Sequence, residues 1–278
     1  MKKTLMLIAA AAAVLLAPLA NAYAHISNPP DYLEQYAQYV AEHPELTVYE
    51  RRLVLELKLY EENYINADVV KDPKNLCVYL SKHFALPEGY EPRALVAVNE
   101  AYAMPGVTLR LDCYVAFLKM ARAMEKDGLC AFIKSGYRIN KPNDDPFDMW
   151  NAWPGHSEHQ TGLAFDLRLK DRTHTLLRNY EYERTAEYAW LMQNAHTHGF
   201  ILSYPEGKEA ITGFYFEPWH WRYVGVTTAT DMKEKGYLTF PEYWVDCLQI
   251  DDSTEMFSYS VPMRPFPDLN GYFYAEER

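Results

Sequence analysis

The sequence of 278 residues lacks the features that mark several large classes of protein. It has no internal repeat, no low-complexity linker and, beyond its first residues, no apolar stretch near the ~20 residues of a membrane span. Basic residues are outnumbered, because 27 Lys and Arg face 38 Asp and Glu and give a net charge of −11. Nucleic acids and anionic membrane surfaces bind positively charged proteins. The composition therefore excludes a multi-span membrane protein and argues against a nucleic-acid partner.

Cysteine is scarce, and its four copies follow no metal-binding pattern. No C-x-x-C pair occurs among Cys77, Cys113, Cys130 and Cys247, so a cysteine zinc site is not expected. Four cysteines allow three disulfide pairings, and buried free thiols are the alternative. The sequence leaves this choice open.

The first 22 residues contain the three parts of a secretory signal peptide. Lys2 and Lys3 give the positive start, residues 5–16 form an apolar run, and Ala20-Asn21-Ala22 is a small-residue cleavage site. An uncleaved membrane anchor is the alternative, but the apolar run is shorter than a span needs. We expect a periplasmic or secreted protein with no membrane span after cleavage.

The whole sequence is 49% hydrophobic, which is enough to bury a sizeable core. Thr47 and Glu50 form a capping box that opens a helix. An amphipathic helix is expected over 112–127, with Val115 and Leu118 on its apolar stripe. Further helices are expected over 31–43 and 186–198, and strands over 129–134, 163–169 and 214–216. This interleaving without regular βαβ spacing favours an α+β fold.

Two segments combine imidazole and carboxylate side chains in a metal-binding pattern. In the first, Gly162 lets the chain fold back, so that His159 and Asp166 can reach one point. In the second, Glu217 and His220 are three residues apart and lie on one side of a helical turn. His159, Asp166 and His220 can then bind a tetrahedral Zn²⁺ whose fourth ligand is water, the open geometry of a catalytic zinc. Glu217 is left beside that water, where a general base is needed.

Three motifs carry a family resemblance. They are Ser157-x-His159-x-x-Gly162-x-Ala164-x-Asp166, Glu217-x-Trp219-His220-x-x-Tyr223-Val224 and Ser135-Gly136-Tyr137-Arg138. With the similar stretches 86–92 and 198–213, they resemble the VanY-type zinc D-alanyl-D-alanine carboxypeptidases over about residues 75–240. The resemblance implies a small antiparallel sheet that carries the zinc site between flanking helices, as in Hedgehog-like D-Ala-D-Ala peptidases.

The resemblance also implies roles for the site residues. One Zn²⁺ would be bound by His159, Asp166 and His220, with Glu217 as the catalytic base. The implied reaction is hydrolysis of the C-terminal D-alanine bond of a peptidoglycan stem peptide, of the D,D or the L,D type.

Two further residues receive roles from the same comparison of motifs. Arg138 is similar to the family arginine that stabilises charge on the reacting carbonyl or holds the peptide carboxylate. Ser157 is similar to the family serine, which can hydrogen-bond substrate or a neighbouring loop.

The expected organisation follows from these motifs. It is a signal peptide (1–22), an N-terminal helical extension (23–74), the zinc carboxypeptidase domain (75–240) and a C-terminal extension packed on the core (241–278). The sequence departs from relatives at Ile139 and Asn140, where Ser and a nearby Gln often occur, and at Ser203, where a basic residue often occurs. These departures leave the peptide specificity open, and the sequence does not indicate an oligomeric state.

Two other functions use some of the same features. Two histidines and one carboxylate also form the metal site of non-haem iron oxygenases, although their first His and carboxylate are normally two residues apart. The third hypothesis is a wall-binding module that keeps zinc but has lost turnover. The presence of Glu217 favours the enzyme over this module.

Overall fold

The computed structural model describes residues 31–141, 145–169 and 179–248. The described chain separates into two compact units, one within residues 63–249 and one whose described part is residues 31–62. The expected signal peptide and most of the expected C-terminal extension lie outside the described residues. None of the helices within the described ranges is long and apolar enough to cross a membrane.

The described part of the first unit contains two helices, α3 (Asp31–Glu42) and α4 (Val48–Glu56). α4 begins at the predicted capping box. The Thr47 hydroxyl accepts a hydrogen bond from the Glu50 N–H, and the Glu50 carboxylate accepts one from the Thr47 N–H at 2.8 Å. The capping box therefore forms as predicted.

The second unit mixes helices with short strands. Its helices are α5 (Leu111–Lys126), α6 (Ala186–Asn194), α7 (Glu209–Thr212), α8 (Val226–Lys235) and α9 (Phe240–Tyr243), with the 3-10 turns η1 (Glu158–Thr161), η2 (Asn179–Arg184) and η3 (Ala195–His198) and the π-helical turn η4 (Trp244–Leu248). Its strands are β1 (Asp68–Val69), β2 (Phe84–Ala85), β3 (Leu95–Ala97), β4 (Thr108–Arg110), β5 (Phe132–Ser135), β6 (Ala164–Arg168), β7 (Phe200–Leu202) and β8 (His220–Tyr223). The predicted α+β class is confirmed.

A four-stranded antiparallel sheet in the order β5-β6-β8-β7 organises this unit. The register places Phe165 opposite Trp221 and Asp166 opposite His220. Because side chains alternate along a strand, the aromatic pair faces one side of the sheet and the Asp–His pair the other. The sheet thus presents an apolar face and a polar face.

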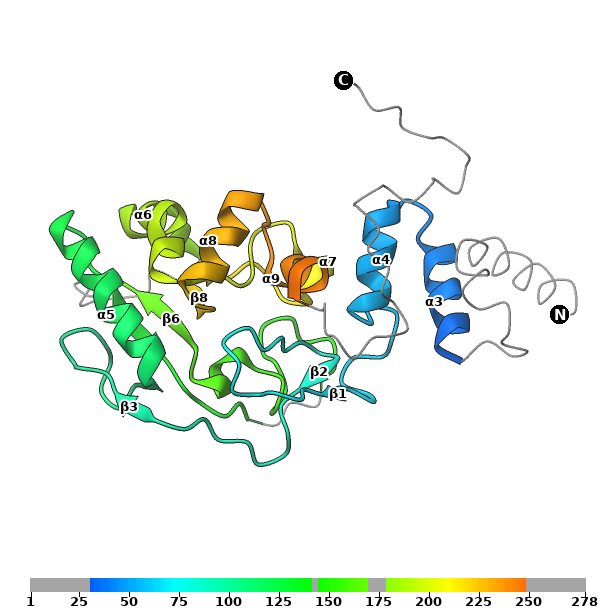
Figure 1. Cartoon of the computed structure of the whole chain (residues 1–278), viewed down its shortest axis with the longest axis horizontal. Helices are drawn as coiled ribbons and strands as arrows, with labels where there is room; N and C mark the ends of the chain where they lie inside the picture. The colour runs from blue at the N-terminus through cyan, green and yellow to red at the C-terminus, as the bar shows by residue number, and fades with distance from the viewer. Residues whose placement is uncertain (1–30, 142–144, 170–178, 249–278) are drawn as a thin grey trace, which may run out of the picture. The chain divides into compact units, whose positions relative to one another are not determined.

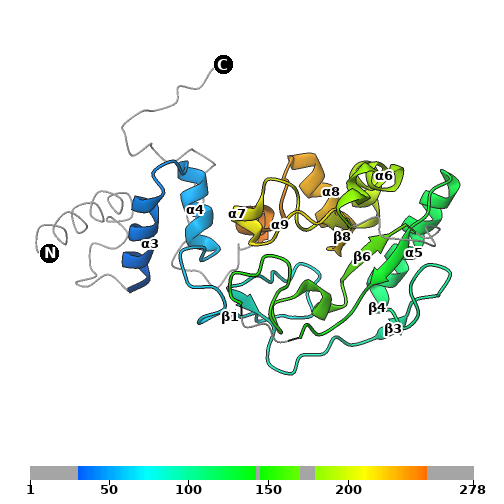
Figure 2. The same ribbon diagram turned by 180° about the vertical axis from the view of Figure 1, so that it is seen from behind.

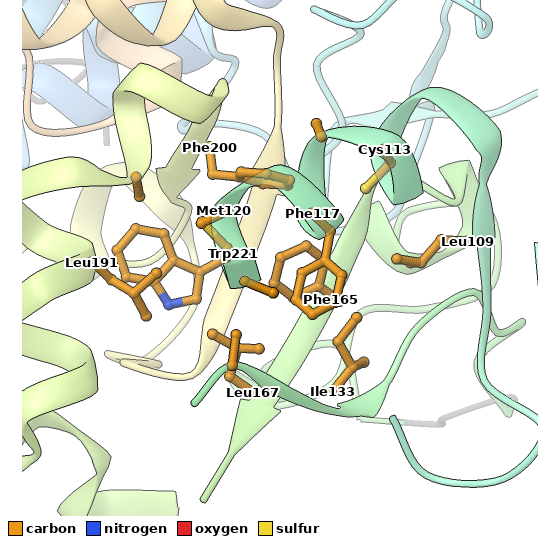
Figure 3. Close-up of a cluster of buried hydrophobic side chains, with 14 of the residues drawn as sticks. Leu109, Cys113, Phe117, Met120, Ile133, Phe165, Leu167, Leu191, Phe200 and Trp221 are labelled. Carbon is orange, nitrogen blue, oxygen red and sulfur yellow. The ribbon is translucent and has the colours of Figure 1, made fainter. Parts of the chain in front are cut away.

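The apolar face is covered by α5, which lies against β6 in both views (Figures 1 and 2). Phe117 of α5 packs edge-on against Phe165, and Phe165 packs in the same way against Phe200, with ring centroids 5.2 Å apart in each pair. Figure 3 shows this cluster with Leu167 and Trp221 beside it. Each such buried side chain contributes about 1.5–3 kcal/mol to folding, so the core fixes the sheet that carries the polar side chains.

Two details of the predicted elements are wrong. Val115, placed on the apolar stripe of α5, is 44% exposed, because the larger side chains of Phe117 and Met120 turn the adjacent face inward. Residues 214–216 form no strand, since the Tyr215 N–H donates to the Met149 carbonyl in a loop. The four cysteines, all of which lie in the described ranges, form no disulfide with one another.

Candidate active site

The three predicted ligands meet on the polar face of the sheet. Asp166 and His220 are register partners on β6 and β8, and His159 comes from η1. η1 ends at Gly162 in a left-handed conformation (φ 71°), where a Cβ would lie 3.2 Å from the Arg110 nitrogen. The predicted fold-back at this glycine is therefore confirmed. One donor atom from each of the three ligands lies within 4.8 Å of the others.

The hydrogen bonds around this cluster orient both imidazole rings. The Asp166 carboxylate oxygen Oδ1 lies 3.3 Å from His159 Nε2 and 3.2 Å from His220 Nδ1. On the far side of its ring, His159 Nδ1 is 2.8 Å from the Gly136 carbonyl. A carbonyl only accepts, so the proton of neutral His159 sits on Nδ1 and the lone pair of Nε2 faces Asp166.

A metal ion fits this arrangement. His159 Nε2 is buried and makes no hydrogen bond within the described part of the chain. Buried polar atoms are normally paired. An imidazole nitrogen left in this state, next to a second imidazole nitrogen and a carboxylate oxygen, is a donor set that suits Zn²⁺.

The fourth predicted residue, Glu217, lies beside the cluster. A turn through Pro218 returns the chain so that the His220 N–H donates to the Glu217 carbonyl at 3.0 Å. The Glu217 carboxylate oxygen Oε2 lies 3.6 Å from His220 Nδ1, and its side chain is 10% exposed. Burial raises the pKa of Glu217 to about 7. A carboxylate with this pKa can both accept and return a proton near neutral pH.

The pKa values of the three clustered side chains are shifted in different directions. Burial opposes ionisation of Asp166, but the neighbouring imidazoles of His159 and His220 outweigh this effect and hold the Asp166 pKa far below its usual range. Burial lowers the pKa of His159, which favours its neutral form. For His220, burial is outweighed by hydrogen bonds to Asp166 and Glu158, which raise its pKa to about 10.

The other two predicted site residues, Arg138 and Ser157, are not part of the cluster of His159, Asp166 and His220. Arg138 is exposed and donates from Nη1 to the Asn140 side chain, whose amide donates to the Ala152 carbonyl at 2.6 Å. The positive charge of Arg138 lowers the pKa of Glu217, so the guanidinium lies within electrostatic range of the cluster. Ser157 is buried immediately before η1, and its side chain makes no capping hydrogen bond to this turn.

Several residues around the cluster were not predicted from the sequence. Asn140, noted only as a departure from relatives, holds Arg138. Gly136 supplies the carbonyl that orients His159. Glu158 occupies an unassigned position of the first motif, and its carboxylate oxygen Oε2 lies 3.0 Å from His220 Nε2. The signal in the sequence was its position directly before His159, a predicted ligand. Tyr204 places its ring 4.8 Å from that of His220.

Comparisons with known proteins agree with this geometry. The profile of the VanY family, described as D-alanyl-D-alanine carboxypeptidase, matches residues 106–226. The protein YodJ of Bacillus subtilis is 33% identical over 193 residues, which are 64% of this chain and 70% of YodJ. The D-alanyl-D-alanine carboxypeptidase of Enterococcus faecium is 33% identical over 181 residues, which are 63% of this chain but only 53% of that protein.

A solved structure is similar as well. The LD-carboxypeptidase LdcB, whose structure is described as revealing peptidoglycan recognition, matches with a TM-score of 0.57 and 31% identity. The match covers 65% of this chain and 91% of LdcB. The peptidase-like fold expected from the motifs is therefore confirmed.

Proposed function

The chain belongs to the VanY family of D-alanyl-D-alanine carboxypeptidases, and on this basis we propose that it is a zinc-dependent enzyme acting on peptidoglycan stem peptides. The reaction is hydrolysis of the bond to the C-terminal D-alanine. The proposal depends on one observation, the cluster of His159, Asp166 and His220 with the carboxylate of Glu217 beside it. Relatives include proteins named for D,D and for L,D bonds, and the proposal covers both.

The chemistry can be assigned to the side chains of the cluster. When bound, Zn²⁺ supplies a water of lowered pKa and polarises the scissile carbonyl. His159 would hold the ion through Nε2, His220 through Nδ1 and Asp166 through a carboxylate oxygen. Glu217 accepts the proton of the attacking water and returns it to the amine of the departing D-alanine.

Two residues are proposed to act on the substrate. Arg138 carries a charge that does not titrate, so it can stabilise negative charge on the reacting carbonyl or bind the terminal carboxylate. Its hydrogen bond to Asn140 limits where the guanidinium can move. Ser157, whose hydroxyl makes no capping hydrogen bond to η1, is proposed to hydrogen-bond the peptide.

The other two hypotheses have less support. The relatives are peptidases, and an iron oxygenase has no need of a carboxylate in the position of Glu217. A module without turnover has no need of it either. Metal analysis of the purified protein separates the oxygenase from the peptidase, because iron with oxygen uptake would favour the former.

The test is digestion of defined muropeptides by the chain without residues 1–22. Release of D-alanine from pentapeptides or tetrapeptides is expected, with loss of activity in a chelator and recovery on addition of Zn²⁺. Glu217→Gln should keep zinc and lower turnover by about 10²–10⁴-fold, the usual contribution of a general base. His220→Ala should lose both zinc and turnover. Full activity in either variant, or in the metal-free protein, would contradict the proposal.

We also propose that residues 1–22 are an export signal and that the enzyme works in the periplasm or outside the cell. The support is the order of charged, apolar and small residues in this segment. Cell fractionation and the mass of the exported chain test it, with Tyr23 expected as the first residue. A chain that stays in the cytoplasm with Met1 or Lys2 at its start would refute it.

A further inference from the structure

Glu158 is a buried carboxylate that the proposed reaction does not use. It lies in η1 between Ser157 and His159 and is only 5% exposed. A carboxylate at this depth is strongly destabilising unless it is paired and hydrogen-bonded. The groups that bind it therefore show what it does.

Three side chains bind the Glu158 carboxylate. Arg222 donates from Nη1 to Oε1 at 2.8 Å, and the Ser203 hydroxyl donates to Oε2 at 2.6 Å. The third partner is Nε2 of His220, 3.0 Å from Oε2. The carboxylate is thus fixed by Ser203, which follows β7, and by two residues of β8, one of which is a proposed metal ligand.

Arg222 is itself held firmly. It is fully buried, and its Nη2 donates to the carbonyls of Leu76 at 2.9 Å and Val78 at 2.8 Å. Arg222 follows His220 by two residues on β8, so both side chains are on the same face of the sheet. The strand that carries the ligand also carries the cation that fixes Glu158.

The two nitrogens of the His220 ring face different groups. Nδ1 lies 3.2 Å from the Asp166 carboxylate, whereas Nε2 faces Glu158. The carboxylate of Glu158, ion-paired to Arg222, only accepts hydrogen bonds, so Nε2 must carry a proton and donate it. The nitrogen available to a metal is then Nδ1, on the side of Asp166. Glu158 lies on the opposite side of the ring and is not a ligand.

We propose that Glu158 is a positioning residue for the metal site. By accepting the Nε2 proton, it holds His220 so that Nδ1 points toward Asp166 and His159. The inference rests on the proposed function, because it requires that these residues bind a metal ion. Loss of such an outer partner of a ligating histidine typically lowers metal affinity or activity by about 10–100-fold.

Glu158→Gln in the full-length protein tests the inference, with Ser203→Ala as the matched control. The amide of E158Q can present its oxygen to only one of His220 and Arg222, and its NH₂ group then meets a donor on the other. We expect its affinity for Co²⁺ and Zn²⁺, measured by competition with a chelator, to fall about 10–100-fold, with an altered Co²⁺ absorption spectrum. S203A keeps the Glu158–His220 contact and should keep the spectrum and affinity of the unaltered protein.

Two measurements separate positioning from a general structural role. Thermal unfolding in chelator reports any loss of stability that does not involve the metal, and such a loss alone would leave the Co²⁺ spectrum unchanged. ¹⁵N NMR of the histidines in the unaltered, zinc-loaded protein needs no variant and decides the question even if E158Q does not fold. It should show His220 protonated at Nε2 and metal-bound at Nδ1.

The outcomes distinguish this inference from the proposed function. A metal bound through Nε2 of His220 would overturn the positioning role alone, as would an E158Q protein with unaltered affinity and spectrum. An unaltered protein that binds neither Co²⁺ nor Zn²⁺ would overturn the proposed function and the positioning role together.

Discussion

At the scale of single residues, a proton and the proposed metal ion would compete for the ring of His220. In the metal-free protein the pKa of His220 is raised to about 10 against the effect of burial, so the imidazole is protonated at neutral pH. A metal ion can bind Nδ1 only after the proton on that nitrogen has left. Binding must therefore release a proton from His220.

The expected result is an affinity that increases with pH. Below the raised pKa, each pH unit increases the unprotonated fraction of His220 about tenfold, so zinc affinity should increase about tenfold per pH unit between about pH 6 and pH 8. Chelator competition at several pH values measures the slope, and calorimetry in two buffers of different ionisation enthalpy counts the protons. An affinity that stays constant over this range would show that His220 is already neutral.

At the scale of elements, the close approach of β5 and β4 supports the proposed metal site. Gly136 follows β5, and a Cβ at this position would lie 2.4 Å from the Thr108 carbonyl oxygen of β4. The Tyr137 N–H donates to the same oxygen at 2.8 Å. The Gly136 carbonyl in turn accepts from His159, so moving this segment moves the ligand.

Gly136→Ala should therefore weaken both stability and metal binding. The added methyl group forces the end of β5 away from β4, at a cost of about 1–3 kcal/mol in the free energy of unfolding. Displacement of the carbonyl that orients His159 should weaken zinc binding about tenfold or more. Denaturant unfolding and chelator competition measure the two effects.

Gly207→Ala is the matched control for this substitution. Its Cβ would have no neighbour within 4 Å, and only the positive φ of 73° opposes it. The control should lose about 1–2 kcal/mol of stability at most and keep its zinc affinity. If G136A binds zinc as tightly as G207A, the strand contact does not support the ligand.

Local patterns predicted individual elements of the chain but not the contacts between them. The capping box of Thr47, the fold-back at Gly162 and the strand that carries Asp166 each follow from a few neighbouring residues, and the structure contains all three. The partners of Glu158 are 45 and 64 residues away in Ser203 and Arg222. No local spacing links residues so far apart, because their meeting depends on how η1 packs against β7 and β8.

At the scale of the whole molecule, every proposed site residue lies in one compact unit. Residues 63–249 contain the four-stranded sheet, α5 and the cluster of His159, Asp166 and His220. A chain cut to these residues should therefore fold cooperatively and bind zinc with the affinity of the full-length protein. Thermal unfolding and zinc titration of the two chains test this, and a shortened chain that is unfolded or metal-free would show that the unit depends on the rest of the protein.

The side chains of the four residues of β8 alternate between the two faces of the sheet. His220 and Arg222 belong to the polar face, whereas Trp221 fills the core between them. Deleting or inserting one residue in this strand would direct an indole at the proposed metal ligands and an imidazole into the apolar core. Insertions and deletions in β8 should therefore be tolerated far less well during evolution than most substitutions of its side chains.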